Sequence, residues 1–308
     1  MWSFLIILVI GFLAQYIDGA LGMGYGASSS SFLITAGIMP VLASASVHTS
    51  EIFASLASGA SHLRFGNVEK KIAVPLTGTG IIGGIVGAYF LATLPSEFVS
   101  PIVAIILLIL GIRIFVRFLW KKQILLYKGE FSNRFLLVLG LIGGTVDAFG
   151  GGGWGPICTS TLVSANKKEP RVIIGSVNIA EFFTTVAIVI TFGITVGFEN
   201  FLWFITIPLI IGGIIAAPVA AYTCKRVSAY LLGTLVGTIL IVLNSRTLIR
   251  TLPGLIGIES PINPDLFIIL GVVVLMSVII VSYWYRSRKT ADQATLQHND
   301  TQDEDVTL

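Results

Sequence analysis

The sequence predicts an all-α fold, a polytopic transmembrane helical bundle built from two inverted-topology repeats. Of the 308 residues, 55% are apolar and 11% are charged, whereas a soluble domain carries about 25% charged residues. This composition excludes a soluble globular enzyme, a disordered chain and a collagen-like chain. The apolar residues fall in runs of about 20, the length that crosses a bilayer as a helix, and the two halves of the chain resemble each other.

Seven apolar runs are long enough to cross the membrane, namely 42–63, 72–93, 99–119, 172–196, 202–223, 228–249 and 265–285. Four shorter runs form two pairs, each joined through a polar or Gly-rich break: 1–17 with 19–36, and 133–149 with 153–165. A helix of about 17 residues reaches about 25 Å. Each short pair therefore either crosses the membrane or enters and returns as a re-entrant pair, and the sequence leaves both forms open.

The two halves align as an internal repeat. Asp18–Gly26 aligns with Asp147–Gly155 at an offset of 129 residues, and each segment is an Asp followed by a Gly-rich stretch. Further matches follow in order: Pro40 with Pro170, Ser46 with Ser176, Glu51 with Glu181, Pro75 with Pro208, Tyr89 with Tyr222, Arg113 with Arg246 and Arg117 with Arg250. Each repeat therefore holds one broken short pair and three long helices.

These matches divide the chain into five parts. Residues 1–120 form the first membrane repeat, 133–250 form the second, and 121–132 are a basic cytoplasmic linker between them. Residues 265–285 add one C-terminal transmembrane helix, and residues 290–308 are polar, acidic and expected to be disordered.

The charges in the loops predict the orientation. With the C-terminus in the cytoplasm, 17 of the 19 Lys and Arg residues lie in cytoplasmic loops or the tail, as the positive-inside rule requires. The N-terminus is then extracytoplasmic. Helix 42–63 runs inward and helix 172–196 runs outward, so the repeats are inverted, a signature of secondary transporters with sites near the bilayer midplane. We expect a multi-pass protein of the plasma or inner membrane.

Four acidic residues lie within apolar segments: Asp18, Glu51, Asp147 and Glu181. A carboxylate in hydrocarbon is costly, and by default it marks a functional site. Asp18 and Asp147 precede the Gly-rich breaks, where they serve either function or the capping of a broken helix. Glu51 and Glu181 lie well inside long helices, which favours a functional role.

Helix 42–63 carries a polar stripe formed by Ser44, His48, Glu51, Ser55, Ser58 and His62. Their spacing of three or four residues puts all six on one helix face, as for a water-lined path, although small Ser residues also pack helices tightly. The second repeat keeps Asn178, Glu181 and Thr185 of this stripe. His48 beside Glu51 suggests a proton relay. A closed metal site would lack ligands, so we expect neither a metal nor a cofactor.

The helix after each Gly-rich break would present free N–H groups and a positive dipole end, which attract anions. Ordinary packing of small residues is the alternative. The residues predicted to contact the anion are Gly24, Tyr25, Gly26, Ser30, Gly153, Trp154, Gly155 and Thr159. The residues predicted to serve coupling or gating are Asp18, His48, Glu51, Asp147, Asn178 and Glu181. Because no Lys or Arg lies deep in a span, a carboxylate that is protonated on anion binding would couple transport to H⁺.

The motif Asp18-Gly-Ala-Leu-Gly-Met-Gly-Tyr-Gly26, followed by Ser46-x-His48-x-x-Glu51, recurs as Asp147 to Gly155 followed by Ser176-x-Asn178-x-x-Glu181. This duplicated pattern resembles the sulfite exporter TauE/SafE family, also called the 4-toluene sulfonate uptake permeases. The resemblance covers about residues 5–285. It implies a secondary carrier, in the plasma or inner membrane, of small anions that often contain sulfur, such as sulfite, sulfoacetate or related sulfonates.

We therefore expect a transporter, not an enzyme, that carries a small anion by alternating access at the repeat interface. A channel with the same polar stripe is the first alternative, and an intramembrane enzyme using Ser44 and His48 or a structural membrane subunit are the others. The expected partners are the anion, H⁺ and the lipid bilayer, with no nucleic acid. The direction of transport and the oligomeric state, a homodimer included, stay open. The repeat-matched Arg residues either snorkel to lipid headgroups or gate each mouth of the path.

Overall fold

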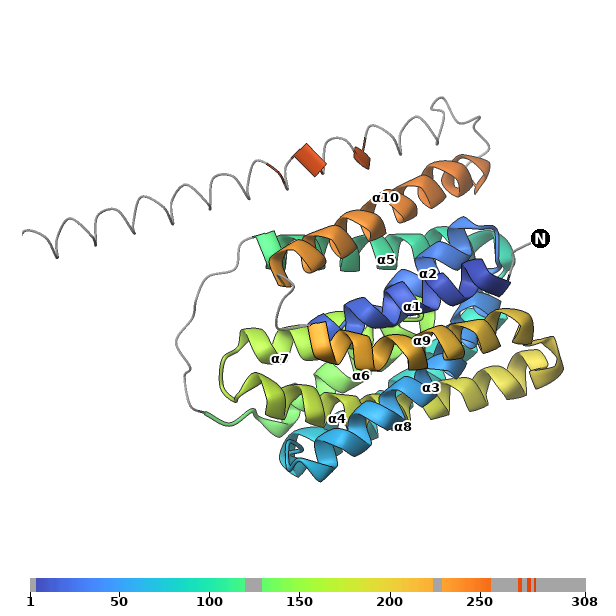
Figure 1. Cartoon of the computed structure of the whole chain (residues 1–308). Coiled ribbons are helices and arrows are strands. Elements are labelled where there is room, and N and C mark those ends of the chain that lie inside the picture. Colours follow the sequence, from blue (N-terminus) through green and yellow to red (C-terminus); the bar gives the residue numbers. More distant parts are fainter. Residues whose placement is uncertain are drawn as a thin grey trace, which may run out of the picture.

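The computed structural model describes residues 4–119, 129–223, 229–255, 271–272, 276–277 and 280 of the chain. Within these residues the regular structure is helical throughout and contains no strand, which confirms the predicted all-α fold (Figure 1). The predicted C-terminal helix 265–285, the acidic tail and the linker 121–132 lie wholly or mostly outside the described residues.

Within the described residues, each half of the chain contributes five α-helices in the same order. The first half forms α1 (Phe4–Leu21), α2 (Tyr25–Thr35), α3 (Pro40–Arg64), α4 (Lys70–Thr93) and α5 (Ser96–Leu119). The second half forms α6 (Asn133–Gly150), α7 (Ser160–Ser164), α8 (Pro170–Phe192), α9 (Trp203–Thr223) and α10 (Ala229–Leu255). A π-helical turn, Gly155–Thr159, leads directly into α7, so that the second short helix starts at Gly155.

Six helical segments in the described part are long and apolar enough to cross a membrane: Lys70–Thr93, Glu97–Leu119, Asn133–Gly150, Pro170–Asn200, Trp203–Ala220 and Tyr230–Pro253. The run 133–149, which we expected to be short, is one of them, because α6 continues for 18 residues to Gly150. Helix α3 has 25 residues but is not in this set, since its polar stripe lowers its hydropathy. These helices support a multi-pass membrane protein.

The breaks inside the short pairs occur at glycines with left-handed backbone. Gly22 and Gly24 separate α1 from α2 with φ angles of 71° and 119°, and Gly151 ends α6 with a φ of 66°. Only glycine adopts these angles at no cost. The first break lies later than the sequence suggested, because α1 continues past residue 17 to Leu21. Asp18 and Asp147 therefore each lie in the last turn of a helix.

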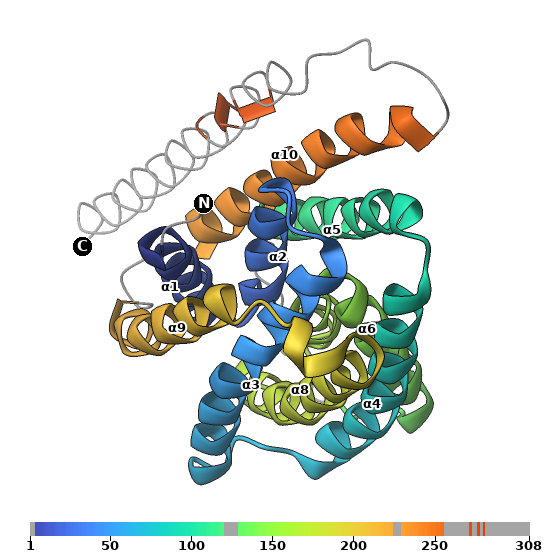
Figure 2. The same cartoon turned by 90° about the vertical axis from the view of Figure 1, so that its right-hand side faces the viewer.

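The helices pack in a pattern that relates the two halves. Helix α1 packs along α9, α4 along α6, α5 along α10 and α3 along α8 (Figures 1 and 2). In the sequence repeat, α1 corresponds to α6 and α9 to α4, so the α1–α9 pair is the counterpart of the α6–α4 pair. The other two pairs join each helix to its own counterpart.

Glycines allow these pairs to approach closely. A Cβ added at Gly83 of α4 would lie 2.2 Å from the carbonyl oxygen of Leu141 in α6, and one added at Gly212 of α9 would lie 2.2 Å from the carbonyl oxygen of Leu8 in α1. Without a hydrophobic driving force in lipid, helices associate by close van der Waals packing through small residues. Part of the high glycine content is therefore explained by helix packing.

Three of the four loops that the charge pattern assigns to the cytoplasm, 64–71, 113–134 and 167–171, meet at one end of the bundle. Lys71 pairs with Glu130 at 2.8 Å, and Lys168 pairs with Glu69 at 3.1 Å. The hydrogen bond from Lys71 lowers the pKa of Glu130, which lies outside the membrane-spanning segments. We call this the basic end. Helix α3 connects it to the opposite end, where α2 is followed by α3.

Candidate functional site

The two Gly-rich breaks lie against each other inside the bundle. A Cβ added at Gly26 would lie 1.7 Å from the carbonyl oxygen of Gly151, and one added at Gly152 would lie 1.8 Å from the backbone nitrogen of Ala27. The breaks meet backbone to backbone, and no side chain fits between them. The glycines are therefore required by the crossing itself.

Asp18 and Asp147 hold the two breaks in equivalent ways. Each carboxylate accepts a hydrogen bond from the backbone N–H seven residues later, from Tyr25 at 3.4 Å and from Trp154 at 2.9 Å. Both residues thus act as caps across the break. A carboxylate of the chain itself therefore already lies at the N-terminal end of each following helix, where an anion was expected to bind.

His48 joins the first half of the chain to the break of the second half. Its Nδ1 lies 2.9 Å from the carbonyl oxygen of Ser44, and its Nε2 lies 3.4 Å from Oδ2 of Asp147. The Ser44 hydroxyl donates to the carbonyl oxygen of Ala148 at 2.7 Å. His48 and Asp147 are fully buried. The N-terminal part of the polar stripe on α3, formed by Ser44 and His48, is thus a packed, hydrogen-bonded contact with α6.

Glu51 lies beside this contact and is the least satisfied member of the group. Glu51 is 7% exposed, and its Oε2 has no hydrogen-bond partner among the described residues. One ligand atom each of His48, Glu51 and Asp147 lie within 4.8 Å of one another, so three groups that can bind a cation meet here. The sequence did not predict the proximity of Asp147. It follows that a proton or another cation can be shared at this point.

The C-terminal part of the stripe, from Glu51 to His62, lines a cavity of about 350 Å³. We call it the carboxylate cavity, since Asp18, Glu51 and Glu181 all line it. The other polar residues that line it are Gln15, Tyr25, Ser55, Ser58, His62, Arg171 and Asn178. His62 and Arg171 lie in the terminal turns of α3 and α8 at the basic end. The cavity therefore extends from the basic end to the carboxylates of Asp18, Glu51 and Glu181.

The stripes of α3 and α8 meet across this cavity. The Asn178 side-chain amide donates to the Ser58 hydroxyl at 2.6 Å. Glu51 of α3 and Glu181 of α8 both line this cavity. The glutamates that the repeat aligns with each other are therefore brought to one site by the packing of α3 on α8.

The residues predicted to contact an anion divide into two groups. Tyr25 lines the carboxylate cavity, and its hydroxyl lies 2.7 Å from that of Ser50. The others belong to the crossing of the breaks and its surroundings, namely Gly24, Gly26, Ser30, Gly153, Trp154, Gly155 and Thr159. Trp154 is fully buried and donates through Nε1 to the carbonyl oxygen of Val177. Direct contact of these buried residues with a substrate stays a prediction that needs a movement of the breaks.

Two residues of the cavity were missed by sequence reasoning, although each had a signal. Gln15 is polar in an apolar run and lies one turn before Asp18. Arg171 lies seven residues before Asn178 and ten before Glu181, a spacing that returns to the same face of α8. Extending the polar stripe to the helix end would have found it.

Comparisons with known proteins agree with this architecture. The family model described as sulfite exporter TauE/SafE matches residues 7–247. A protein of Bacillus subtilis (strain 168), named "Probable membrane transporter protein YtnM", is 40% identical over 274 residues, which cover 88% of this chain and 90% of that protein. No solved structure matches the chain.

Proposed function

The chain belongs to the sulfite exporter TauE/SafE family, and from this premise we propose that it is a secondary transporter of a small anion. The substrate class is that of sulfite, sulfoacetate and other sulfonates. The family description supports this class, and the relative's name, a membrane transporter, supports a carrier rather than an enzyme.

The observation that carries the proposed mechanism is the carboxylate cavity. Asp18, Glu51 and Glu181 line it, while the one Lys or Arg among its lining residues is Arg171, at the basic end. Buried ionised groups without a paired opposite charge are costly. An anion entering the cavity would add to this cost unless Glu51 or Glu181 takes up a proton. We therefore infer that the anion and H⁺ bind together, which couples transport to H⁺.

The contacts favour different roles for the two acidic pairs. Asp18 and Asp147 cap the breaks, and Asp147 also orients His48. Glu51 and Glu181 are free of such caps and lie on facing helices, so we place the coupling on them. One ligand atom of His48 lies within 4.8 Å of both the Asp147 and the Glu51 carboxylates, so His48 is suited to pass a proton between them.

Alternating access between two inverted repeats is supported by the helix pairing. The α1–α9 and α6–α4 pairs exchange under the sequence repeat, while α3–α8 and α5–α10 join counterparts, as expected for two halves related by a twofold axis. Moving one half against the other would separate the breaks and expose the glycines at their crossing. The basic end would face the cytoplasm, with the protein in the cell membrane.

Flux in proteoliposomes of purified protein tests the proposal. We would load sulfite, sulfoacetate, thiosulfate or sulfate, with and without a pH gradient, beside the Glu51→Gln variant. The expected result is saturable flux of one anion that the gradient drives and that Glu51→Gln no longer couples. Flux that ignores both the gradient and the substitution would contradict proton coupling.

Counterflow separates a carrier from a channel with the same polar stripe. A carrier exchanges labelled internal for unlabelled external anion at a rate that saturates. Flux that rises linearly with concentration and shows no exchange would favour the channel.

A further inference from the structure

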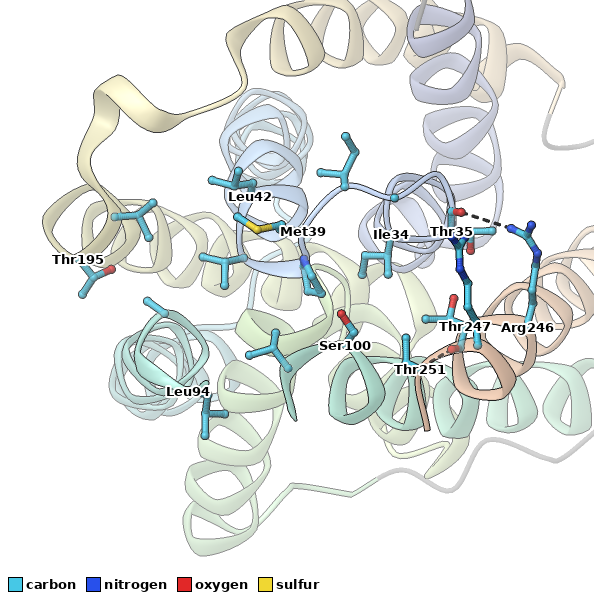
Figure 3. Close-up of a pocket in the computed structure, with 18 residues that line it drawn as sticks. Ile34, Thr35, Met39, Leu42, Leu94, Ser100, Thr195, Arg246, Thr247 and Thr251 are labelled. Carbon is cyan, nitrogen blue, oxygen red and sulfur yellow. Dashed lines mark hydrogen bonds between the residues drawn. The ribbon is translucent and has the colours of Figure 1, made fainter. Parts of the chain in front are cut away.

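A second cavity, of about 520 Å³, lies at the end of the bundle opposite the basic end (Figure 3). It is bounded by the end of α2, the start of α3, the start of α5 and the last turns of α10. We call it the arginine cavity, because Arg246 and Arg250 both line it. It shares no lining residue with the carboxylate cavity, and none of the residues predicted to contact the anion lines it.

The charged residues among the described lining of this cavity are both arginines. Arg246 and Arg250 are four residues apart on α10 and so lie on the same helix face. None of the eighteen lining residues is acidic. Arg246 donates to the carbonyl oxygen of Thr35 at 3.3 Å, at the C-terminal end of α2. Arg250 is exposed and has no ion-pair partner among the described residues. Among the described residues that line the cavity, an anion meets the two arginines and no carboxylate.

Hydroxyl groups near these cations remain available as hydrogen-bond donors. The Thr35 hydroxyl is buried and has no partner in the described part of the chain, and none of the side-chain hydrogen bonds there involves Ser100. Ser100 belongs to the first turns of α5, and Figure 3 shows its side chain among those that line the cavity. By contrast, the Thr247 and Thr251 hydroxyls donate to carbonyl groups of their own helix. Guanidinium groups with nearby hydroxyls suit an oxyanion, because both groups donate hydrogen bonds to its oxygens.

The geometry points to a binding site for a small oxyanion in the arginine cavity, held by Arg246 and Arg250 with Thr35 and Ser100. This site is separate from the proposed transport site and does not depend on transport being observed. Its occupant is either a free anion of the sulfonate, sulfite or phosphate class or the phosphate of a lipid headgroup. Both present the same chemistry to the arginines.

Cysteine reactivity tests the sign of the field in this cavity. We would place Ser100→Cys in a Cys224→Ser background, where the remaining Cys158 is buried, and compare anionic sulfonate and cationic ammonium methanethiosulfonate reagents. The matched control is Ser58→Cys in the carboxylate cavity. In water, two positive charges that each lie about 6 Å from a reacting thiol change the rate of a singly charged reagent by about tenfold. The ratio of the anionic to the cationic rate is expected to be at least tenfold higher at Ser100→Cys than at Ser58→Cys.

Arginine variants and added anions identify the binding groups and the occupant. Arg250→Gln should remove most of the anionic preference, while the exposed Arg134→Gln should not change it. Sulfoacetate or phosphate in excess should slow the labelling of protein in phosphatidylcholine nanodiscs if the occupant is a free anion. Slowing only in phosphatidylglycerol nanodiscs would instead identify a headgroup. An equal ratio at both cysteines, a ratio unchanged by Arg250→Gln, or a Ser100→Cys thiol that reacts with neither reagent would overturn the proposal.

Discussion

His48 Nε2 lies 3.4 Å from Oδ2 of Asp147, and this contact joins α3 of the first half to the last turn of α6 in the second. Both residues are fully buried. Because Asp147 also accepts the backbone N–H of Trp154, one carboxylate fixes both the second break and the imidazole ring.

Replacing His48 with Ala should therefore destabilise the protein. It leaves Oδ2 of Asp147 buried with one partner fewer, and an unsatisfied buried polar group costs about 1–3 kcal/mol. Thermal unfolding in detergent would measure the loss as a lower Tm. His62→Ala, at the half-buried end of the same stripe, should change the Tm much less. Equal Tm values for both variants would contradict the structural role of His48.

The crossing of the breaks predicts a sharp difference between glycines. Gly26→Ala and Gly152→Ala each place a methyl group less than 2 Å from the backbone of the other break, which requires the crossing to separate. Both variants should show a large loss of folded protein, measured by size-exclusion chromatography in detergent. Gly78→Ala is the control, since nothing lies within 4 Å of its added Cβ. That substitution, inside helix α4, should stabilise by up to about 1 kcal/mol.

The cap at the first break distinguishes a structural from a coupling role for Asp18. Asp18→Asn keeps an oxygen that accepts the Tyr25 N–H, so its Tm and its H⁺-driven flux should remain close to those of the unsubstituted protein. Asp18→Ala removes the cap and should cost about 1 kcal/mol. A folded Asp18→Asn variant that has lost H⁺-driven accumulation would instead assign the coupling to this carboxylate.

Glu181 should behave like its repeat partner Glu51. In Glu181→Gln the carboxylate cavity loses an ionisable group, so accumulation driven by a pH gradient should be abolished while counterflow exchange continues. Both rates are measured in the same proteoliposome preparation. Glu199→Gln, an exposed substitution in the turn after α8, should leave both rates unchanged. Loss of exchange as well as accumulation would point to a binding role rather than a coupling role.

Much of the fold follows from the sequence alone. Apolar run length located five of the six helical segments that are long and apolar enough to cross a membrane, because a bilayer fixes the length that a helix must cover. The internal repeat aligned α3 with α8 as sequence counterparts. The helical spacing of about 3.6 residues per turn put Glu51, Ser55 and Ser58 on one face of α3, and these three residues line a cavity. Hydropathy does not define the boundaries of these helices, because left-handed glycines end α1 at Leu21 and α6 at Gly150.

Only the tertiary structure decided how these local features combine. The sequence identified two glycine breaks, two aspartates and two glutamates. It could not tell that the breaks meet backbone to backbone, that the aspartates cap them, or that His48 pairs with Asp147, 99 residues away. Such contacts depend on how helices distant in the chain pack, and helical periodicity defines a face without naming its partner. The arginine cavity arises in the same way, since α10 brings Arg246 to Thr35, which is 211 residues away.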